Sequence, residues 1–224
     1  MKYLWAMVPW LLWTQGAMAH AVTQGDKGYL AQVSGVQIPS FVYLGAKHMV
    51  TGYDHLLFLF GVIFFLYGVR QIGAYVSLFA LGHSLTMLAG VWFGIGINPY
   101  IIDAIIGFSV VYKALDNLGA FERWFGVRPS PKGAVFVFGL LHGFGLASKL
   151  LDYEIASDGL LVNLVAFNVG VELGQITALL LILMVMHQWR AMPRFARQAY
   201  AANVLLMTAG FALMFYQIAG LVLA

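Results

Sequence analysis

Long apolar stretches separated by short polar segments dominate the chain. Six of these stretches approach the roughly 20 residues that an α-helix needs to cross a bilayer. They cover residues 53–69, 72–93, 100–119, 133–151, 161–187 and 200–223. The segments between them carry glycine, proline and charged residues, which are typical of turns. The pattern predicts an all-α integral membrane protein in which residues 41–224 form one bundle of six transmembrane helices.

The first residues have the pattern of a targeting segment. Lys2 supplies a positive charge, residues 4–13 form a short apolar core, and Ala17-Met18-Ala19 provides a small-residue cleavage site. We therefore expect residues 1–19 to be a signal peptide and residues 20–40 to be an extracytoplasmic segment. If the signal is retained, the bundle has seven helices instead of six.

The charged residues between the stretches orient the bundle. Basic residues gather in the cytoplasmic loops of membrane proteins. Seven of them fall on one side of the predicted spans: Arg70, Arg123, Arg128, Lys132, Arg190, Arg194 and Arg197. The acidic residues Asp152, Glu154 and Asp158 fall on the other side. This distribution predicts a multi-pass protein of a bacterial inner membrane, with the mature N-terminus in the periplasm.

Composition narrows the surroundings and the chemistry. Only 9% of the 224 residues are charged, against about 25% in soluble domains. The net charge of +3 follows from the orienting residues, so we expect the lipid bilayer as a partner and no nucleic acid. The chain has no cysteine, which excludes disulfides and thiolate metal sites. It also has no GxxxxGK[ST] phosphate loop, which excludes the familiar form of ATP hydrolysis.

A few ionisable residues lie inside the apolar stretches. His83, His142 and Glu172 fall near the middle of three predicted helices, while Asp54 and His55 open the first one. A charge at the centre of a membrane helix costs at least about 2.5–3.5 kcal/mol, so we expect these groups to meet inside the bundle. Imidazole and carboxylate without thiolate form a ligand set suited to Zn²⁺ or Ni²⁺. The sequence therefore predicts one shared metal site.

His48 can join this site only if the chain bends. It lies seven residues before His55, which is about 10 Å along a straight helix. The two side chains cannot bind one ion across that distance. A break at Thr51-Gly52 would fold His48 back toward His55, and without the break two sites lie along a path.

Glu172 belongs to a polar stripe on the fifth predicted span. Asn168 and Gln175 lie on the same helix face, at i−4 and i+3. The stripe predicts that Glu172 faces the bundle interior. Glycine pairs at four-residue spacing favour close helix packing, and they occur in two spans, at Gly139, Gly143, Gly170 and Gly174.

Four segments together carry a family resemblance. They are His48-x5-Asp54-His55, GHSLTM at 82–87, LLHGFGLA at 140–147 and FNVGVELGQ at 167–175. The first resembles the HX5DH signature of the HupE/UreJ proteins, membrane proteins associated with hydrogenase and urease and regarded as nickel permeases. The others look like further recurring segments of that family, and the resemblance covers about residues 45–220.

The resemblance implies a metal role for six residues: His48, Asp54, His55, His83, His142 and Glu172. One departure concerns the family's second motif, FHGx[AV]xGxE. FNVGVELGQ keeps a glycine and the glutamate but has Asn168 where that motif has histidine.

Three functions fit these residues. In the first, which we favour, a permease takes a divalent transition-metal ion past His48, Asp54 and His55 to the buried cluster. Nickel is the favoured ion, with zinc or cobalt as alternatives. In the second, three histidines hold Zn²⁺ and Asp54 or Glu172 is the general base of an intramembrane hydrolase of a lipid or amide. In the third, the metal is structural in an accessory protein, with metalloenzyme maturation proteins as partners. The oligomeric state stays open.

Overall fold

The computed structural model describes residues 34–151 and 158–223, and every regular element within these ranges is an α-helix. In chain order they are α3 (Ile38–Thr51), α4 (Tyr53–Ile63), α5 (Val69–Phe93), α6 (Pro99–Asn117), α7 (Ala120–Phe125), α8 (Pro131–Leu151), α9 (Leu160–Arg190) and α10 (Phe195–Leu223). The predicted all-α class is confirmed. The expected signal peptide and most of the segment 20–40 lie outside the described residues.

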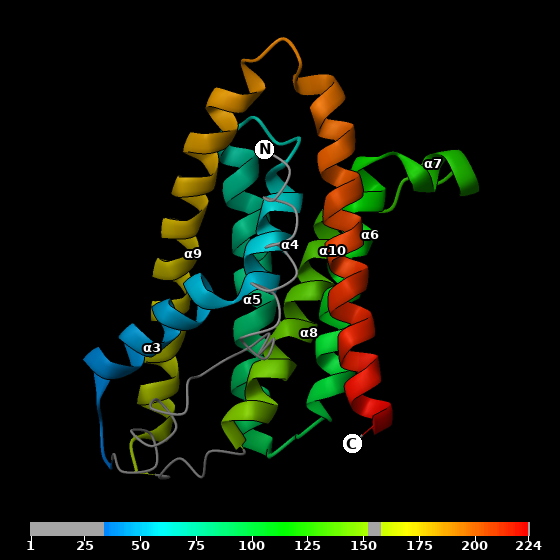
Figure 1. The fold of residues 1–224 in the computed structure, drawn as a ribbon. Coiled ribbons are helices and arrows are strands. Elements are labelled where there is room, and N and C mark those ends of the chain that lie inside the picture. Colours follow the sequence, from blue (N-terminus) through cyan, green and yellow to red (C-terminus); the bar gives the residue numbers. More distant parts are fainter. Residues whose placement is uncertain (1–33, 152–157, 224) are drawn as a thin grey trace, which may run out of the picture.

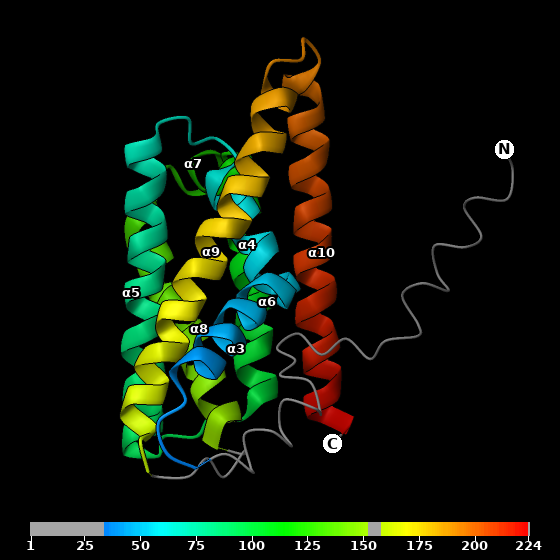
Figure 2. The same ribbon diagram turned by 90° about the vertical axis from the view of Figure 1, so that its left-hand side faces the viewer.

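The long helices form a bundle. α5, α6, α8, α9 and α10 run side by side in alternating directions, α4 lies among them, and α3 packs obliquely against α9 (Figures 1 and 2). α5, α8, α9 and α10 are long and apolar enough to cross a membrane. α6 has 19 residues but carries Asp103, Lys113 and Asp116. The architecture fits a multi-pass membrane protein, and the number of six crossings stays a prediction.

The first predicted span, 53–69, is wrong as a single crossing helix. Within 53–69 the chain forms only α4, which follows α3 after a break at Gly52, and α5 already begins at Val69. α4 has 11 residues, about 16 Å of helix, which is roughly half the hydrocarbon thickness of a bilayer. Hydropathy gives no sign of the helix end because the connection 64–68 is mostly apolar too.

Three helix pairs meet at glycines that let their backbones approach closely. A methyl group at Gly174 of α9 would lie 2.7 Å from a backbone oxygen of α3. One at Gly139 of α8 would lie 2.5 Å from a backbone oxygen of α5, and one at Gly107 of α6 would lie 2.6 Å from a backbone nitrogen of α10. These spaces admit only hydrogen, so the close packing predicted from the glycine pairs of α8 and α9 is confirmed.

Polar side chains hold the end of α4 inside the bundle. Asn117 of α6 donates a hydrogen bond to the carbonyl of Gly61 at 2.8 Å. Arg190, at the end of α9, donates to the carbonyls of Ile63 and Phe64. The last carbonyls of a helix have no partner within it, and a cation there also offsets the negative end of the helix dipole. These bonds fix α4 relative to α6 and α9.

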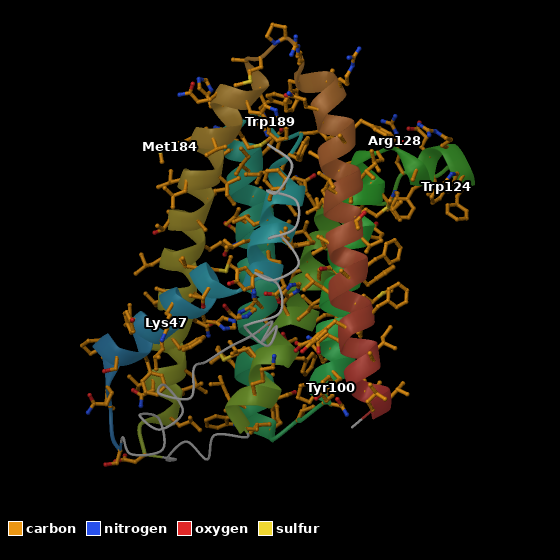
Figure 3. All side chains as sticks on the ribbon, viewed as in Figure 1. Lys47, Tyr100, Trp124, Arg128, Met184 and Trp189 are labelled. Atoms are coloured by element: carbon orange, nitrogen blue, oxygen red, sulfur yellow. The ribbon has the colours of Figure 1, made fainter. Side chains whose placement is uncertain are left out.

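The seven basic residues that orient the predicted spans lie toward one end of the bundle (Figure 1). The α4–α5 and α9–α10 connections lie at that end, and α7 projects sideways near it (Figure 1). Figure 3 shows Trp124 and Arg128 on this projecting segment and Trp189 near the top of α9. Asp158 is the first residue of the second described range and lies at the opposite end of the bundle. Asp152 and Glu154 lie outside the described residues. The cytoplasmic side of the basic end stays a prediction.

We expect Gly107→Ala to destabilise the protein and Gly73→Ala to leave it unchanged or slightly more stable. The methyl group at residue 107 meets the backbone of α10, whereas nothing lies within 4 Å of one at residue 73 on α5. Overpacking costs about 1–3 kcal/mol, while alanine is a better helix former than glycine. Thermal unfolding in detergent, followed by the loss of the monodisperse species, measures both. Equal melting temperatures for the two variants would contradict the glycine contacts.

Candidate metal centre

Three histidines from three helices meet in the bundle interior. His48 on α3, His55 on α4 and His83 on α5 each offer a ring nitrogen, and these three atoms all lie within 4.8 Å of one another. The side chains are at most 3% exposed. The ring centroids of His48 and His55 are 5.0 Å apart, and those of His55 and His83 are 6.1 Å apart. Small side-chain rotations would let one ion contact all three.

The break at Gly52 brings His48 to this group. Gly52 ends α3 by donating to the carbonyl of His48 at 3.0 Å, and its own carbonyl accepts from Leu56 at 3.1 Å in the first turn of α4. A single residue with φ −74° and ψ 100° thus closes one helix and opens the next. The predicted bend is present, and His48, expected at the rim, lies in the centre.

Gly52 also leaves room for the side chains of the next turn. A methyl group there would lie 2.8 Å from Nδ1 of His55 and 3.1 Å from Oδ1 of Asp54. The position therefore needs glycine because of close approach, although its backbone angles are open to other residues. The sequence indicated the break but gave no sign of this contact.

Asp54 orients His55. Its Oδ1 accepts a hydrogen bond from Nδ1 of His55 at 3.1 Å, and both side chains are 1% exposed. Because a carboxylate accepts, Nδ1 carries the proton, and Nε2 of a neutral His55 then presents its lone pair to a metal. The arrangement is the carboxylate–histidine pairing that supports ligands in metal sites. Its carboxylate supplies negative charge close to the histidines.

His142 stands beside the three histidines but outside the group within mutual reach. Its ring centroid is 5.0 Å from that of His55, and its Nδ1 donates to the carbonyl of Phe138 at 2.7 Å. That bond fixes the proton on Nδ1 and leaves Nε2 as the ligand atom of the neutral ring. His142 can therefore take an ion from His55 or complete its coordination after a shift of the ring.

Close packing joins α5, which carries His83, to α8, which carries His142. A methyl group at Gly143 would collide with the backbone carbonyl of His83. Thr86 links the same helices by donating to the carbonyl of Leu140 at 2.6 Å. The aromatic ring of Phe79 lies against both histidines, with its centroid 6.2 Å from His83 and 4.9 Å from His142. This apolar lining keeps the histidines in a low-dielectric environment.

Glu172 is not part of the cluster, and the expectation that it shares the site is wrong in this fold. Its side chain is exposed on the surface of α9, whereas Asn168 and Gln175 of the same stripe are buried, at 8% and 2% exposure. At about 100° per residue, Glu172 lies about 40° beyond Asn168 on the helix surface, away from Gln175. That rotation places it past the edge of the covered face.

The space next to the histidines is small. A cavity of about 10 Å³ adjoins His55 and reaches Tyr75 of α5 and Gln175 of α9. A volume of this size holds about one water molecule. The three histidines are therefore closely surrounded by other side chains within the described residues.

The chain was compared with known proteins. The family model described as HupE / UreJ protein matches residues 24–224, which include the whole described bundle. A search of curated proteins and a search of solved structures each gave no match. The family suggests a role in metal transport or as a metal accessory protein, in agreement with the buried histidine cluster. The chain therefore belongs to the HupE / UreJ protein family.

Proposed function

We propose that the protein is a permease for a divalent transition-metal ion, with nickel as the favoured cargo. One observation carries this proposal. His48, His55 and His83 converge from three helices at the centre of an apolar bundle, where a polar group is retained only at a cost. Imidazole nitrogen is a ligand for nickel, zinc and cobalt alike.

The charge of the site suits transport better than permanent storage. Neutral imidazoles replace the water around the ion without adding charge, and Asp54 supplies one carboxylate through His55. With Glu172 outside the cluster, a divalent ion keeps uncompensated charge in low dielectric. Such a site binds reversibly, and protonation of its ligands releases the ion.

We propose the inner membrane as the location, with ions entering from the periplasmic side and leaving at the basic end. The proposal is supported by the charge difference between the two ends of the bundle. It places six crossings across the bilayer, with α6 and the broken α3–α4 segment added to the four long apolar helices. Without a phosphate loop in the sequence, transport is facilitated or coupled to a gradient.

The small cavity beside His55 favours a permease over a hydrolase. Pockets that bind organic substrates have volumes of about 300–1,000 Å³, against about 10 Å³ beside His55. An ion without its water shell fits in such a space, and a lipid does not. Turnover of a lipid amide or ester by the purified protein, lost on chelation, would instead support the hydrolase.

We expect metal affinity to depend on Asp54 and His83 but not on Glu172. Asp54→Asn removes the charge behind His55 and should lower affinity about 10–100-fold, as losses of such supporting groups do. His83→Ala removes a ligand and should lower affinity at least as much. Glu172→Gln, a mid-membrane carboxylate on the exposed face of α9, is the matched control. Calorimetric titration with Ni²⁺ in detergent measures all three, and a loss with Glu172→Gln alone would contradict this site.

Gly52→Ala should weaken metal binding without unfolding the bundle. The added methyl group displaces the imidazole of His55 and its bond to Asp54, while the backbone angles of residue 52 are allowed for alanine. Circular dichroism should show unchanged helix content, and the Ni²⁺ titration should show reduced affinity. An unchanged affinity would mean that the geometry at the break does not set the site.

Purified protein in liposomes that hold a fluorescent chelator should admit metal ions. We expect faster uptake of Ni²⁺ than into empty liposomes, with Co²⁺ and Zn²⁺ compared in the same assay, and a large loss of uptake with His83→Ala. The Glu172→Gln variant should transport like the wild type. Folded protein that binds metal but moves none of the three ions would contradict the permease and favour the accessory role.

A further inference from the structure

A permease must open the closed cluster to one side of the membrane at a time. The three histidines are at most 3% exposed, so an ion can reach them only when helices separate. We call the contact between two neighbouring helices a seam, and helices separate most easily at seams without close backbone contact. The route of the ion therefore rests on the proposed function and depends on how the helices are paired.

The glycine contacts divide the bundle into units. α3 packs with α9, α5 with α8, and α6 with α10, each pair through backbone contact at glycine. Within such a pair any relative motion is opposed by atoms already in contact. Between pairs the helices meet through side chains, which can change rotamer. The seam between α6 and α8 therefore joins two units that can move relative to each other.

An ion pair closes this seam at the end opposite the basic residues. Nζ of Lys149, in the last turn of α8, lies 2.9 Å and 3.3 Å from the two carboxylate oxygens of Asp103 on α6. The two side chains are 15% and 7% exposed. Figure 1 places the ends of α6 and α8 that carry these residues on the same side of the bundle.

Beneath the ion pair, two apolar side chains of α6 cover α8. Ile102 and Ile106 of α6 pack onto Gly145 of α8, where a methyl group would lie 2.8 Å and 3.5 Å from their side chains. These isoleucines are at most 2% exposed. His142 lies three residues before Gly145, and its ring neighbours His55. From this end of α8, the order is thus Lys149 of the ion pair, Gly145 under the isoleucines, and His142, whose ring lies beside His55.

We propose that Asp103 and Lys149 form the outer gate of the metal route, and that ions enter along the α6–α8 seam. The gate opens when the pair separates and the isoleucines rotate away from Gly145. Lys149 holds the carboxylate while the gate is closed. When the gate is open, Asp103 meets the arriving cation in place of the ammonium group.

The energetics of the pair fit a contact that opens. A shielded ion pair gains Coulomb energy but loses hydration, so its net contribution to stability is small. It can therefore separate into water or headgroups at modest cost. A pair of well-packed apolar side chains would hold the same seam as firmly but would offer no ligand to an entering ion.

Cross-linking tests the gate, and the absence of cysteine from the chain permits it without background. Asp103→Cys with Lys149→Cys is bridged by a short bifunctional methanethiosulfonate reagent. We expect the bridge to stop Ni²⁺ uptake into liposomes and to protect bound Ni²⁺ from EDTA in detergent. Reduction, which removes the bridge, should restore both.

The matched control bridges the same end of α6 within one unit. Tyr100→Cys with Gly220→Cys joins α6 to α10, where a methyl group at residue 220 would lie 2.5 Å from the ring of Tyr100. Figure 3 shows Tyr100 at that end of the bundle, near the C-terminal end of α10. This bridge should leave uptake and EDTA stripping unchanged. Equal block by both bridges, or free uptake through the bridged gate, would overturn the proposal.

A milder variant keeps the test informative if the double-cysteine protein does not fold. Asp103→Asn retains the shape and loses the charge, so EDTA should strip Ni²⁺ faster while the number of ions bound stays the same. A lower melting temperature with unchanged stripping would mark the pair as a structural tie and overturn the gate. If the pair controls stripping but wild-type protein gives no uptake, the permease fails and the gate stands. If wild-type protein binds no metal, both fail.

Discussion

Close backbone contact at glycine holds this bundle together. Lipid chains are as apolar as the helix surfaces, so burial of apolar side chains gives helices little reason to associate in a bilayer, and tight packing must supply it. The contacts at Gly107, Gly139 and Gly174 each join one pair of helices. Everything polar in the interior depends on them. The helices that carry His83 and His142 meet at Gly143, where nothing larger than hydrogen separates α5 from α8.

A broken helix builds the centre of the site from a short piece of sequence. α3 and α4 meet at Gly52, so His48 and His55 approach from the two sides of one break. The break leaves α4 too short to cross a bilayer, and Asn117 and Arg190 take up its terminal carbonyls. The cost of interrupting a helix in an apolar environment is reduced at the break because Gly52 donates to His48 and accepts from Leu56. The gain is a cluster that a straight helix cannot form.

The same division into helix pairs connects binding with movement. Atoms in backbone contact resist sliding, while side-chain contacts between pairs can rearrange. In the function we propose, a cluster of neutral imidazoles with one carboxylate nearby binds a divalent ion reversibly. The ion pair of Asp103 with Lys149 joins two of these helix pairs. In the proposed permease, the helix pairs hold the ligands in place and the contacts between the pairs open to admit the ion.

The sequence by itself determined the membrane class, the long helices, the family and the residue types of the site, because hydropathy and side-chain chemistry are local properties. It also indicated the break at Gly52. The tertiary structure decided which candidates meet. Glu172 and Gln175 both lie on the polar stripe of α9, yet only Gln175 is buried. The neighbouring helices cover one arc of α9, and Glu172 lies outside that arc, about 60° around the helix from Gln175. His48 lies in the cluster and His142 lies beside it for the same reason. The groups that a side chain meets depend on which helices pack around it, and local sequence patterns do not specify that packing.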